Sequence, residues 1–442
     1  MAFKTFIDVE EYLDSFSYID KSNPPGLIRK SRLERMVNLL NWIGNPQNDF
    51  KAIHIAGSKG KGSTATFTSV LLEAKGYATG LYLSPHVSDF RERFTLAGKY
   101  FSDDFYISVA NKLSNLILGF KNDYSLGQEK PTTFEMYTAY AYLLFKEYGC
   151  EYCVIETGLG GRLDATNTIN SIASVITPIE LEHTSILGDT IEKIATEKSK
   201  IIKKSQCVFV SRQDDKALSI IENECNNNGS ILFSFNDNIQ NFSSRVTNFG
   251  EVVSFNIKNE NKYTLNLSVY GEKQAENAAL SILIASKLGF LSDEGIKSIE
   301  KIKIKARFMR LKVNNIDIVI DVAHTPKSIL DTTNTFKAIF EDATLIFGAV
   351  EGKDIEHMVK ILINNFSHII LSRPGTFKKS NIEEIYNIAK ENDPTKDIIV
   401  IEDNQKAIEE ALNRKKPILI TGSFYLAGPM INYLEDKYGI EC

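Results

Sequence analysis

Residues 51–67 read KAIHIAGSKGKGSTATF, and this stretch decides the fold class. Its first six residues form a short apolar run with the length of a buried strand. From Thr64 onward, apolar side chains recur at the spacing of one helix face, and Gly76 is placed to end that helix. Three glycines therefore lie between a strand and a helix N-terminus, where free N–H groups and the helix dipole favour an anion.

This glycine loop departs from the usual phosphate-loop pattern G-x-x-x-x-G-K-[ST]. If Gly60 and Lys61 are its GK pair, isoleucine stands at the first glycine position and glycine at the hydroxyl position. A flexible glycine turn is the simpler alternative. The strand and helix on either side favour a nucleotide site, in which Lys61 supplies charge and Ser63 or Thr64 reaches a metal.

Strand-like and helix-like segments alternate along the first part of the chain. With 442 residues the chain is too long for one ordinary core, so two or three domains are expected. The alternation predicts a parallel α/β architecture. Residues 226–270 are Asn-rich and broken, which predicts hairpins, and a helix is expected near 274–288. The expected strands are 51–56, 79–83, 151–155, 173–179 and 206–210.

The stretch KIKIKARF (301–308) predicts a domain boundary. After it, five apolar runs (IDIVID, TLIFGAV, HIILSR, IIVIED and PILITGS) are separated by helix-like segments, the pattern of a doubly wound sheet. We therefore expect an α/β protein with two domains. Residues 1–300 would form a phosphate-loop, parallel-sheet ATPase domain with a small β-rich subregion, and residues 301–442 a Rossmann-like domain.

Charge and composition exclude several classes of protein. The net charge is −5 and no dense Lys/Arg block stands out, so neither a nucleic acid nor a membrane surface is an expected partner. A signal peptide begins with a cationic stretch followed by an apolar one, whereas the start of this chain carries acidic residues. No apolar run is long enough for a transmembrane helix. Five thinly spread cysteines indicate a reduced, cytoplasmic setting. Cys150 and Cys153 form a CxxC pair; buried strand thiols are favoured over a zinc site.

Polar side chains follow four further strand candidates. They are Ser84, Glu156, His183 and Asp321. Singly, each would be a capping or turn residue. Because ligands of open α/β sheets gather beyond the carboxyl ends of strands, the four together suggest one cation-assisted site. Oxygen ligands from Ser84 and Glu156 suit magnesium, whereas His183 is a less usual magnesium ligand.

A lysine interrupts the apolar stripe of the segment 189–204, DTIEKIATEKSKIIKK. Asp189 is expected to cap this helix, with Glu192 in a capping-box arrangement. Lys198 lies seven residues after Ile191, on the inward face. A buried lysine is costly unless it is paired or modified, so a function is favoured over snorkelling of the side chain to the edge.

Taken in order, segments along nearly the whole chain resemble the folylpolyglutamate synthase and dihydrofolate synthase family of the muramyl-ligase superfamily. The most specific are GLGGRLDATN and EHTSILGDTIEKIATEK. The others are GLIRKSRLERMVNLLNWIGNPQ (26–47), IHIAGSKGKGS, SPH with ERF (92–94), TTFEMYTAYAYLLF (132–145), NAALS, DVAHTP, FGAVEGKD and ITGSFYLAG.

The resemblance implies a function and a set of site residues. The reaction would be ATP-dependent ligation of L-glutamate to a folate, and also to dihydropteroate in a bifunctional member, through an acyl phosphate and by a monomer. Lys198, His183 and Lys61 would be catalytic, with Lys198 carbamylated by CO2. Magnesium would be held by Ser84, Glu156 and His183. ATP would contact Lys59, Gly60, Lys61, Gly62, Ser63, Asn277, Arg307, Asp321 and His324. The pterin substrate would lie near Thr132, Thr133, Phe134, Glu135, Leu163, Asp164 and Ala165.

The chain departs from the family pattern at several positions. In the glycine loop, Ser58-Lys59 stands where the family has Thr-Asn. In the family motif GLDH, Glu180 and Glu182 replace Gly and Asp, and the family motif EKAG is EKSK here. DVAHTP replaces DGAHNP, and Ile304-Lys305-Ala306 replaces Trp-Pro-Gly. Two alternatives are a cell-wall muramyl ligase and a non-catalytic nucleotide-binding relative. TTFEMYTA and DATN favour the folate branch, and the intact metal set favours catalysis.

Overall fold

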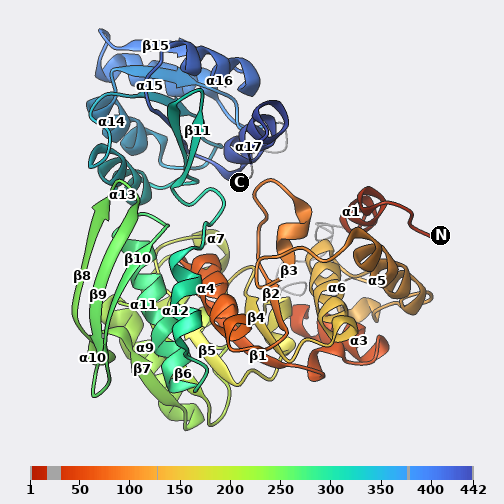
Figure 1. Cartoon of the computed structure of the whole chain (residues 1–442). Coiled ribbons are helices and arrows are strands. Elements are labelled where there is room, and N and C mark those ends of the chain that lie inside the picture. Colours follow the sequence, from red (N-terminus) through yellow and green to blue (C-terminus); the bar gives the residue numbers. More distant parts are fainter. Residues whose placement is uncertain (1, 17–30, 127, 376–378, 441–442) are drawn as a thin grey trace.

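The computed structural model describes residues 2–16, 31–126, 128–375 and 379–440. Figure 1 shows two α/β units, with the unit formed by the last third of the chain above the larger N-terminal one. The larger unit contains a seven-stranded sheet of order β3-β2-β4-β1-β5-β6-β7, parallel except for the edge strand β3. Its strands are β1 (Lys51–Ala56), β2 (Thr79–Tyr82), β3 (Phe94–Leu96), β4 (Tyr152–Glu156), β5 (Ala173–Ile176), β6 (Cys207–Val210) and β7 (Ile231–Ser234).

Helices cover both faces of this sheet, because the strand side chains are apolar on both sides. Along β1, Ala52 packs into one core cluster and Ile53 into another on the opposite face. On the Ala52 side lie α1 (Phe6–Asp14), α3 (Arg32–Trp42), α5 (Asp103–Leu116), α6 (Thr133–Tyr148), α8 (Ile191–Ser199) and α9 (Asp215–Asn228). On the Ile53 side lie α4 (Lys61–Ala74), α11 (Glu272–Lys287) and α12 (Asp293–Glu300).

Hairpins predicted within residues 226–270 form a small antiparallel sheet, and the structure shows that this sheet packs against α11 (Figure 1). Its strands are β8 (Ile239–Thr247), β9 (Gly250–Ile257) and β10 (Lys262–Leu267). The hairpin prediction was wrong for residues 226–234, because α9 continues to Asn228 and β7 joins the large sheet in parallel. The apolar run of β7 is only three residues long and lies in an Asn- and Ser-rich stretch, so composition did not separate it from the hairpins that follow.

The C-terminal unit is doubly wound, and all five predicted strands are present and mutually parallel. The sheet order is β11-β12-β16-β13-β14-β15, with β11 an antiparallel edge strand that the sequence had not indicated. Its strands are β11 (Met309–Val313), β12 (Ile316–Ile320), β13 (Thr344–Phe347), β14 (His368–Leu371), β15 (Asp397–Val400) and β16 (Ile418–Thr421). Its helices are α13 (Pro326–Lys337), α14 (Ile355–Asn365), α15 (Ile382–Asn392), α16 (Asn404–Asn413) and α17 (Phe424–Tyr438). The exact division of domains at residues 300 and 301 stays a prediction.

Two helix starts differ from the sequence expectation. Helix α4 begins at Lys61 rather than Thr64, because Gly60 adopts a left-handed conformation and serves as its N-cap. Helix α8 is capped by Thr190 rather than Asp189, which instead pairs with Lys193 at 2.8 Å. Cys150 and Cys153 are buried in the apolar core. Of the segment 26–47, residues 26–30 lie outside the described part of the chain.

The two units touch where α17 meets the loop after β2. A Cβ atom added to Gly428 would lie 2.1 Å from the carbonyl oxygen of Val87, so only glycine permits this approach. The loop is also held from the other unit by Lys305, whose Nζ donates to Ser88 Oγ at 3.0 Å. Because Ser84 opens the same loop, the position of the C-terminal unit is coupled to that of Ser84.

We therefore expect Gly428→Ala to impair turnover more than folding. Alanine favours the helix itself, but its methyl group would push α17 away from the loop. Small displacements of reacting groups can reduce turnover by roughly a hundredfold. Steady-state kinetics and a thermal melt test this prediction. Unchanged turnover would show that the contact does not position the site.

Candidate active site

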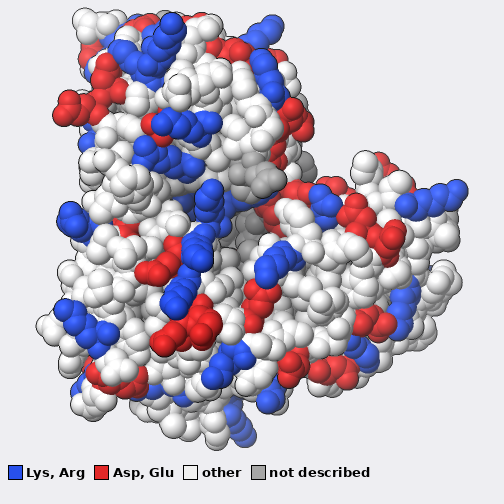
Figure 2. Space-filling model, in the orientation of Figure 1, with Lys and Arg blue, Asp and Glu red and all other residues white. Residues whose placement is uncertain are grey.

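A cavity of about 1180 Å³ lies between the two units and is lined by both. Strand ends β1, β2, β4, β5 and β6 supply its lower wall, while β12 and α13 supply residues from the C-terminal unit. Figure 2 shows this region as a hollow beneath the upper unit, with Lys and Arg side chains gathered along it. The predicted ATP and metal residues all line this cavity: Lys59, Gly60, Lys61, Gly62, Ser63, Asn277, Arg307, Asp321, His324, Ser84, Glu156 and His183.

The glycine loop curls tightly after β1. Gly57 has a φ of 152°, and a Cβ atom there would lie 1.8 Å from Thr177 Oγ1. Gly60 has a φ of 81°, and a Cβ atom there would lie 2.7 Å from Asn277 Oδ1 on α11. The N–H groups of Ser58 and Lys59 both donate to the carbonyl of Pro178, at 2.8 and 3.2 Å. The loop is thus fixed with the first turn of α4 at the cavity, an arrangement that binds phosphate.

The cavity is lined by both cations and carboxylates, and not every cation pairs directly with a carboxylate. Six Lys and Arg residues line it in the part of the chain that the structure describes. Four lie within ion-pair distance of carboxylates: Lys61, Arg212, Lys273 and Lys327. Among the described residues, Lys59 and Arg307 have no carboxylate at that distance. They approach from opposite units, so a polyanion between them would meet positive charge on two sides.

Ser84 and Glu156 form a pair of oxygen donors beside Lys61. Glu156 Oε2 accepts from the backbone N–H of Ser84 at 3.0 Å, and Oε1 lies 3.7 Å from Lys61 Nζ. Burial raises the pKa of Glu156, although Lys61 opposes that shift. The hydroxyl Oγ of Ser84 is buried and has no hydrogen-bond partner among the described residues. An orphaned hydroxyl next to a carboxylate fits magnesium, which prefers oxygen ligands.

His183 reaches the same cavity through a strained backbone. Its φ of 47° is unusual for a residue other than glycine, and it starts the short helix α7 (Thr184–Leu187). Desolvation at the cavity lowers the pKa of His183, although the charge of Glu182 opposes that shift. In the described part of the chain, no three His, Cys, Asp or Glu residues gather as a metal site. If His183 binds magnesium, it would therefore do so beside the oxygen ligands Ser84 and Glu156. This role of His183 stays a prediction.

Lys198 lies behind the cavity wall. Its side chain is only 2% exposed, which confirms the inward orientation and excludes snorkelling to the edge. Nζ donates to the carbonyl of Gly57 at 2.6 Å and to Glu182 Oε1 at 2.8 Å. Burial lowers the pKa of Lys198 to about 8, with Lys61 adding to the shift and Glu182 opposing it. Lys198 thus ties the glycine loop to the loop that carries His183.

Asp321 and His324 belong to the turn between β12 and α13, which lines the cavity from the C-terminal unit. Asp321 accepts from the N–H groups of Phe308 and Ala323, both at 2.8 Å, and from Thr332 Oγ1 at 3.0 Å. Burial lowers the pKa of His324 to about 4, and its Nδ1 lies 2.8 Å from a backbone carbonyl. The Arg307 guanidinium lies over the ring of Phe424 at 5.0 Å. These contacts position the upper wall of the cavity.

The residues predicted for the pterin side lie outside this cavity, around α6 and β4. Thr132 and Glu135 form a capping box on α6, and Glu135 pairs with the buried Arg35 at 3.0 Å. Thr133 donates to the carbonyl of Phe16. The ring of Phe134 packs on Gly158, and Asp164 caps the short helix Ala165–Thr168 that follows Leu163. The structure gives these residues packing and capping contacts, and their contact with substrate stays a prediction.

Sequence reasoning missed several cavity cations. Arg212 lies two residues after the end of β6, so the strand-end rule that selected Ser84 and Glu156 would have found it. It pairs with Glu276 at 2.9 Å. Lys273 lies one helical turn before Asn277 on α11. Lys327 lies in the first turn of α13, and no local pattern indicated that it faces the cavity.

Comparison with known proteins agrees with this architecture. The Mur ligase middle domain model matches residues 55–285, and the Mur ligase glutamate ligase domain model matches residues 306–424. A Bacillus subtilis protein named dihydrofolate synthase/folylpolyglutamate synthase is 31% identical over 94% of this chain and 97% of its own length.

Two solved structures resemble the whole chain. The Thermotoga maritima folylpolyglutamate synthase has a TM-score of 0.83 at 28% identity, covering 97% of this chain and 96% of its own. The Mycobacterium tuberculosis folylpolyglutamate synthase complexed with ADP has a TM-score of 0.85 at 26% identity, covering 96% and 97%. The chain therefore belongs to the folylpolyglutamate and dihydrofolate synthase family of the Mur ligases.

Proposed function

We propose that this protein is an ATP-dependent ligase that joins L-glutamate to a folate, with dihydropteroate as a second acceptor. The observation that carries the proposal is the phosphate loop after β1. Its own Lys59 and the Arg307 of the C-terminal unit line one cavity from opposite units, together with Ser84 and Glu156. The family supports it: the Bacillus subtilis relative carries both synthase names, and the Mycobacterium tuberculosis relative was solved with ADP.

The reaction has two steps, and the protein mainly positions reactants and balances charge. An acceptor carboxylate oxygen attacks the γ-phosphorus of ATP, and the bond to the β-phosphate oxygen breaks, giving an acyl phosphate and ADP. The free amine of glutamate then attacks the acyl carbon, phosphate leaves, and the amide forms with loss of a proton. Lys61, the N–H groups of the first turn of α4, and Arg307 face the negative charge that builds up.

Magnesium fits this site by the orphaned Ser84 hydroxyl and the Glu156 carboxylate. When held there with His183, it would supply positive charge that screens the transferring phosphate. Closure of the two units would exclude water, which otherwise hydrolyses an acyl phosphate. Lys305 and Gly428, at the contact between units, support that closure.

Carbamylation of Lys198 is part of the proposal. A carbamate forms when a neutral amine attacks CO2, and a pKa of about 8 makes the neutral amine available at mildly alkaline pH. The carbamate would replace the positive charge that Lys198 now presents to the carbonyl of Gly57 and to Glu182 with a negative one. We further propose a cytoplasmic monomer. In the described part of the chain, no helix has the length and apolar character to cross a membrane.

The test is ADP release by the purified protein with ATP, magnesium and L-glutamate, varying the acceptor. Turnover with tetrahydrofolate indicates a folylpolyglutamate synthase, with dihydropteroate a dihydrofolate synthase, and with both a bifunctional enzyme. Turnover only with a UDP-muramyl substrate would favour a cell-wall ligase. ATP binding without turnover on any acceptor would favour a non-catalytic relative and contradict the proposal.

A further inference from the structure

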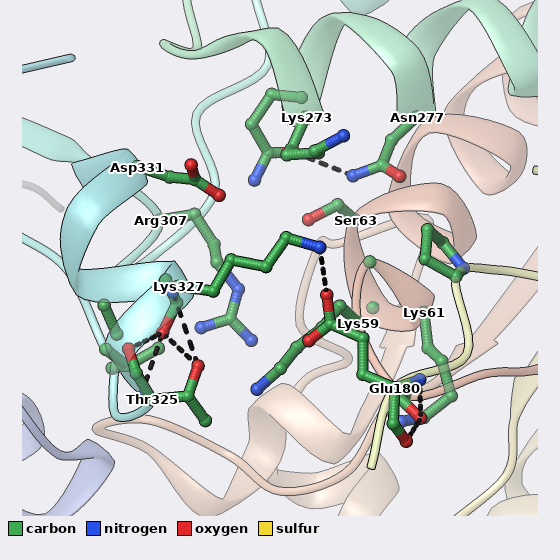
Figure 3. Close-up of a pocket in the computed structure, with 18 of the residues that line it drawn as sticks. Lys59, Lys61, Ser63, Glu180, Lys273, Asn277, Arg307, Thr325, Lys327 and Asp331 are labelled. Atoms are coloured by element: carbon green, nitrogen blue, oxygen red, sulfur yellow. Dashed lines mark hydrogen bonds and ion pairs between the residues drawn. The ribbon is translucent and has the colours of Figure 1, made fainter. Parts of the chain in front are cut away.

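An ion pair crosses the cavity directly in front of the phosphate loop. Lys327 Nζ lies 2.7 Å from Glu180 Oε1. Lys327 belongs to the first turn of α13 in the C-terminal unit, and Glu180 to the loop after β5 in the N-terminal unit. Figure 3 shows the Lys327 side chain extending from α13 across the cavity to the Glu180 carboxylate. The pair therefore lies where a triphosphate on the loop would lie.

The backbone of Glu180 is held at this position by Ser58. Its N–H donates to Ser58 Oγ at 3.0 Å, and Ser58 Oγ in turn lies 3.1 Å from its carbonyl oxygen. Its side chain is 26% exposed, and its charge raises the pKa of Lys59 against the effect of burial. A carboxylate beside the phosphate loop repels an incoming polyanion and competes with it for the nearby cations.

Lys327 is free to move, in contrast. Its side chain is 66% exposed and has a long flexible stem. An exposed lysine–carboxylate pair is a weak interaction, whereas a phosphate oxygen forms a stronger, charge-assisted hydrogen bond with an ammonium group. Exchange of Glu180 for a phosphate therefore needs only rotation of this side chain.

We propose that Lys327 is a further phosphate-binding residue for ATP, held by Glu180 until the nucleotide enters. Glu180 acts as the competing anion: it closes the cavity between the units when ATP is absent and lowers the affinity for ATP. Lys327 thus raises the affinity for the nucleotide, and Glu180 lowers it. This inference rests on the proposed ATP-dependent function.

The test measures binding of the non-hydrolysable analogue β,γ-methylene-ATP by calorimetry to the full-length protein and to single variants. We expect Glu180→Gln to tighten binding about threefold, because no ion pair must break. We expect Lys327→Met to weaken binding about tenfold, because one charge-assisted hydrogen bond is lost. The loss should be absent for AMP, which lacks the terminal phosphates.

Matched controls and opposite outcomes make the test decisive. Glu356→Gln and Lys360→Met break an exposed pair at 2.6 Å on α14, away from the cavity, and should leave binding unchanged. If the ion pair only stabilised the contact between the units, both cavity variants would lower the melting temperature. Neither would then change the affinity for the ATP analogue. Weaker binding by Glu180→Gln would also overturn the inference. Absence of both ATP binding and turnover in the unaltered protein would instead contradict the proposed function.

Discussion

Replacing Lys198 with alanine is expected to reduce turnover by roughly a hundred- to a thousandfold while the fold is retained. The Lys198 Nζ group donates to the carbonyl of Gly57 and to Glu182. Its removal therefore leaves a half-buried carboxylate without this partner and the glycine loop without its anchor. The loss should appear in kcat more than in the dissociation constant of ATP, because Lys198 lies behind the cavity wall. Single-turnover kinetics and a thermal melt measure the two effects separately.

Chemical rescue distinguishes two roles for Lys198. If its carbamate is the working form, the space left by alanine should accept formate or acetate, and activity should recover with either anion. If the ammonium group is the working form, methylamine should restore activity and the anions should not. Removal of bicarbonate from the unaltered enzyme should lower turnover only in the first case. Normal turnover of Lys198→Ala without any additive would contradict both roles.

Replacing Glu156 with glutamine is expected to reduce turnover by a similar factor, roughly a hundred- to a thousandfold. Glutamine retains an oxygen that accepts from the N–H of Ser84 but loses the charge that attracts magnesium and faces Lys61. ATP should still bind, since one negative charge near the phosphates is removed. Turnover measured against magnesium concentration should show a raised requirement for the metal.

A buried carboxylate elsewhere provides the control for Glu156. Glu251 is 2% exposed, has its pKa raised by burial, and accepts from the N–H of Gly271 at 2.9 Å. Glu251→Gln therefore makes the same chemical change in a similar environment, outside the cavity lining. If both variants lost activity equally, the loss would come from disturbing a buried carboxylate. Full activity of Glu156→Gln would contradict the metal site.

Much of the site could be predicted because its residues follow local rules. The glycine loop lies between β1 and α4, and Ser84, Glu156 and His183 follow strands whose carboxyl ends meet at one edge of the sheet. Helical spacing alone placed Lys198 on the buried face. Local rules were less accurate at element ends: the cap of α8 moved by one residue, and the edge strand β7 was missed.

The sequence by itself determined the alternation of strands and helices, the phosphate loop and the burial of Lys198, because these depend on periodicity and on residues close together in the chain. Only the tertiary structure decided which side chains meet. Glu180 and Lys327 are 147 residues apart, and Arg212 pairs with Glu276 across 64 residues. Contacts of that kind depend on sheet order and on how the two units pack, neither of which is encoded in a local pattern.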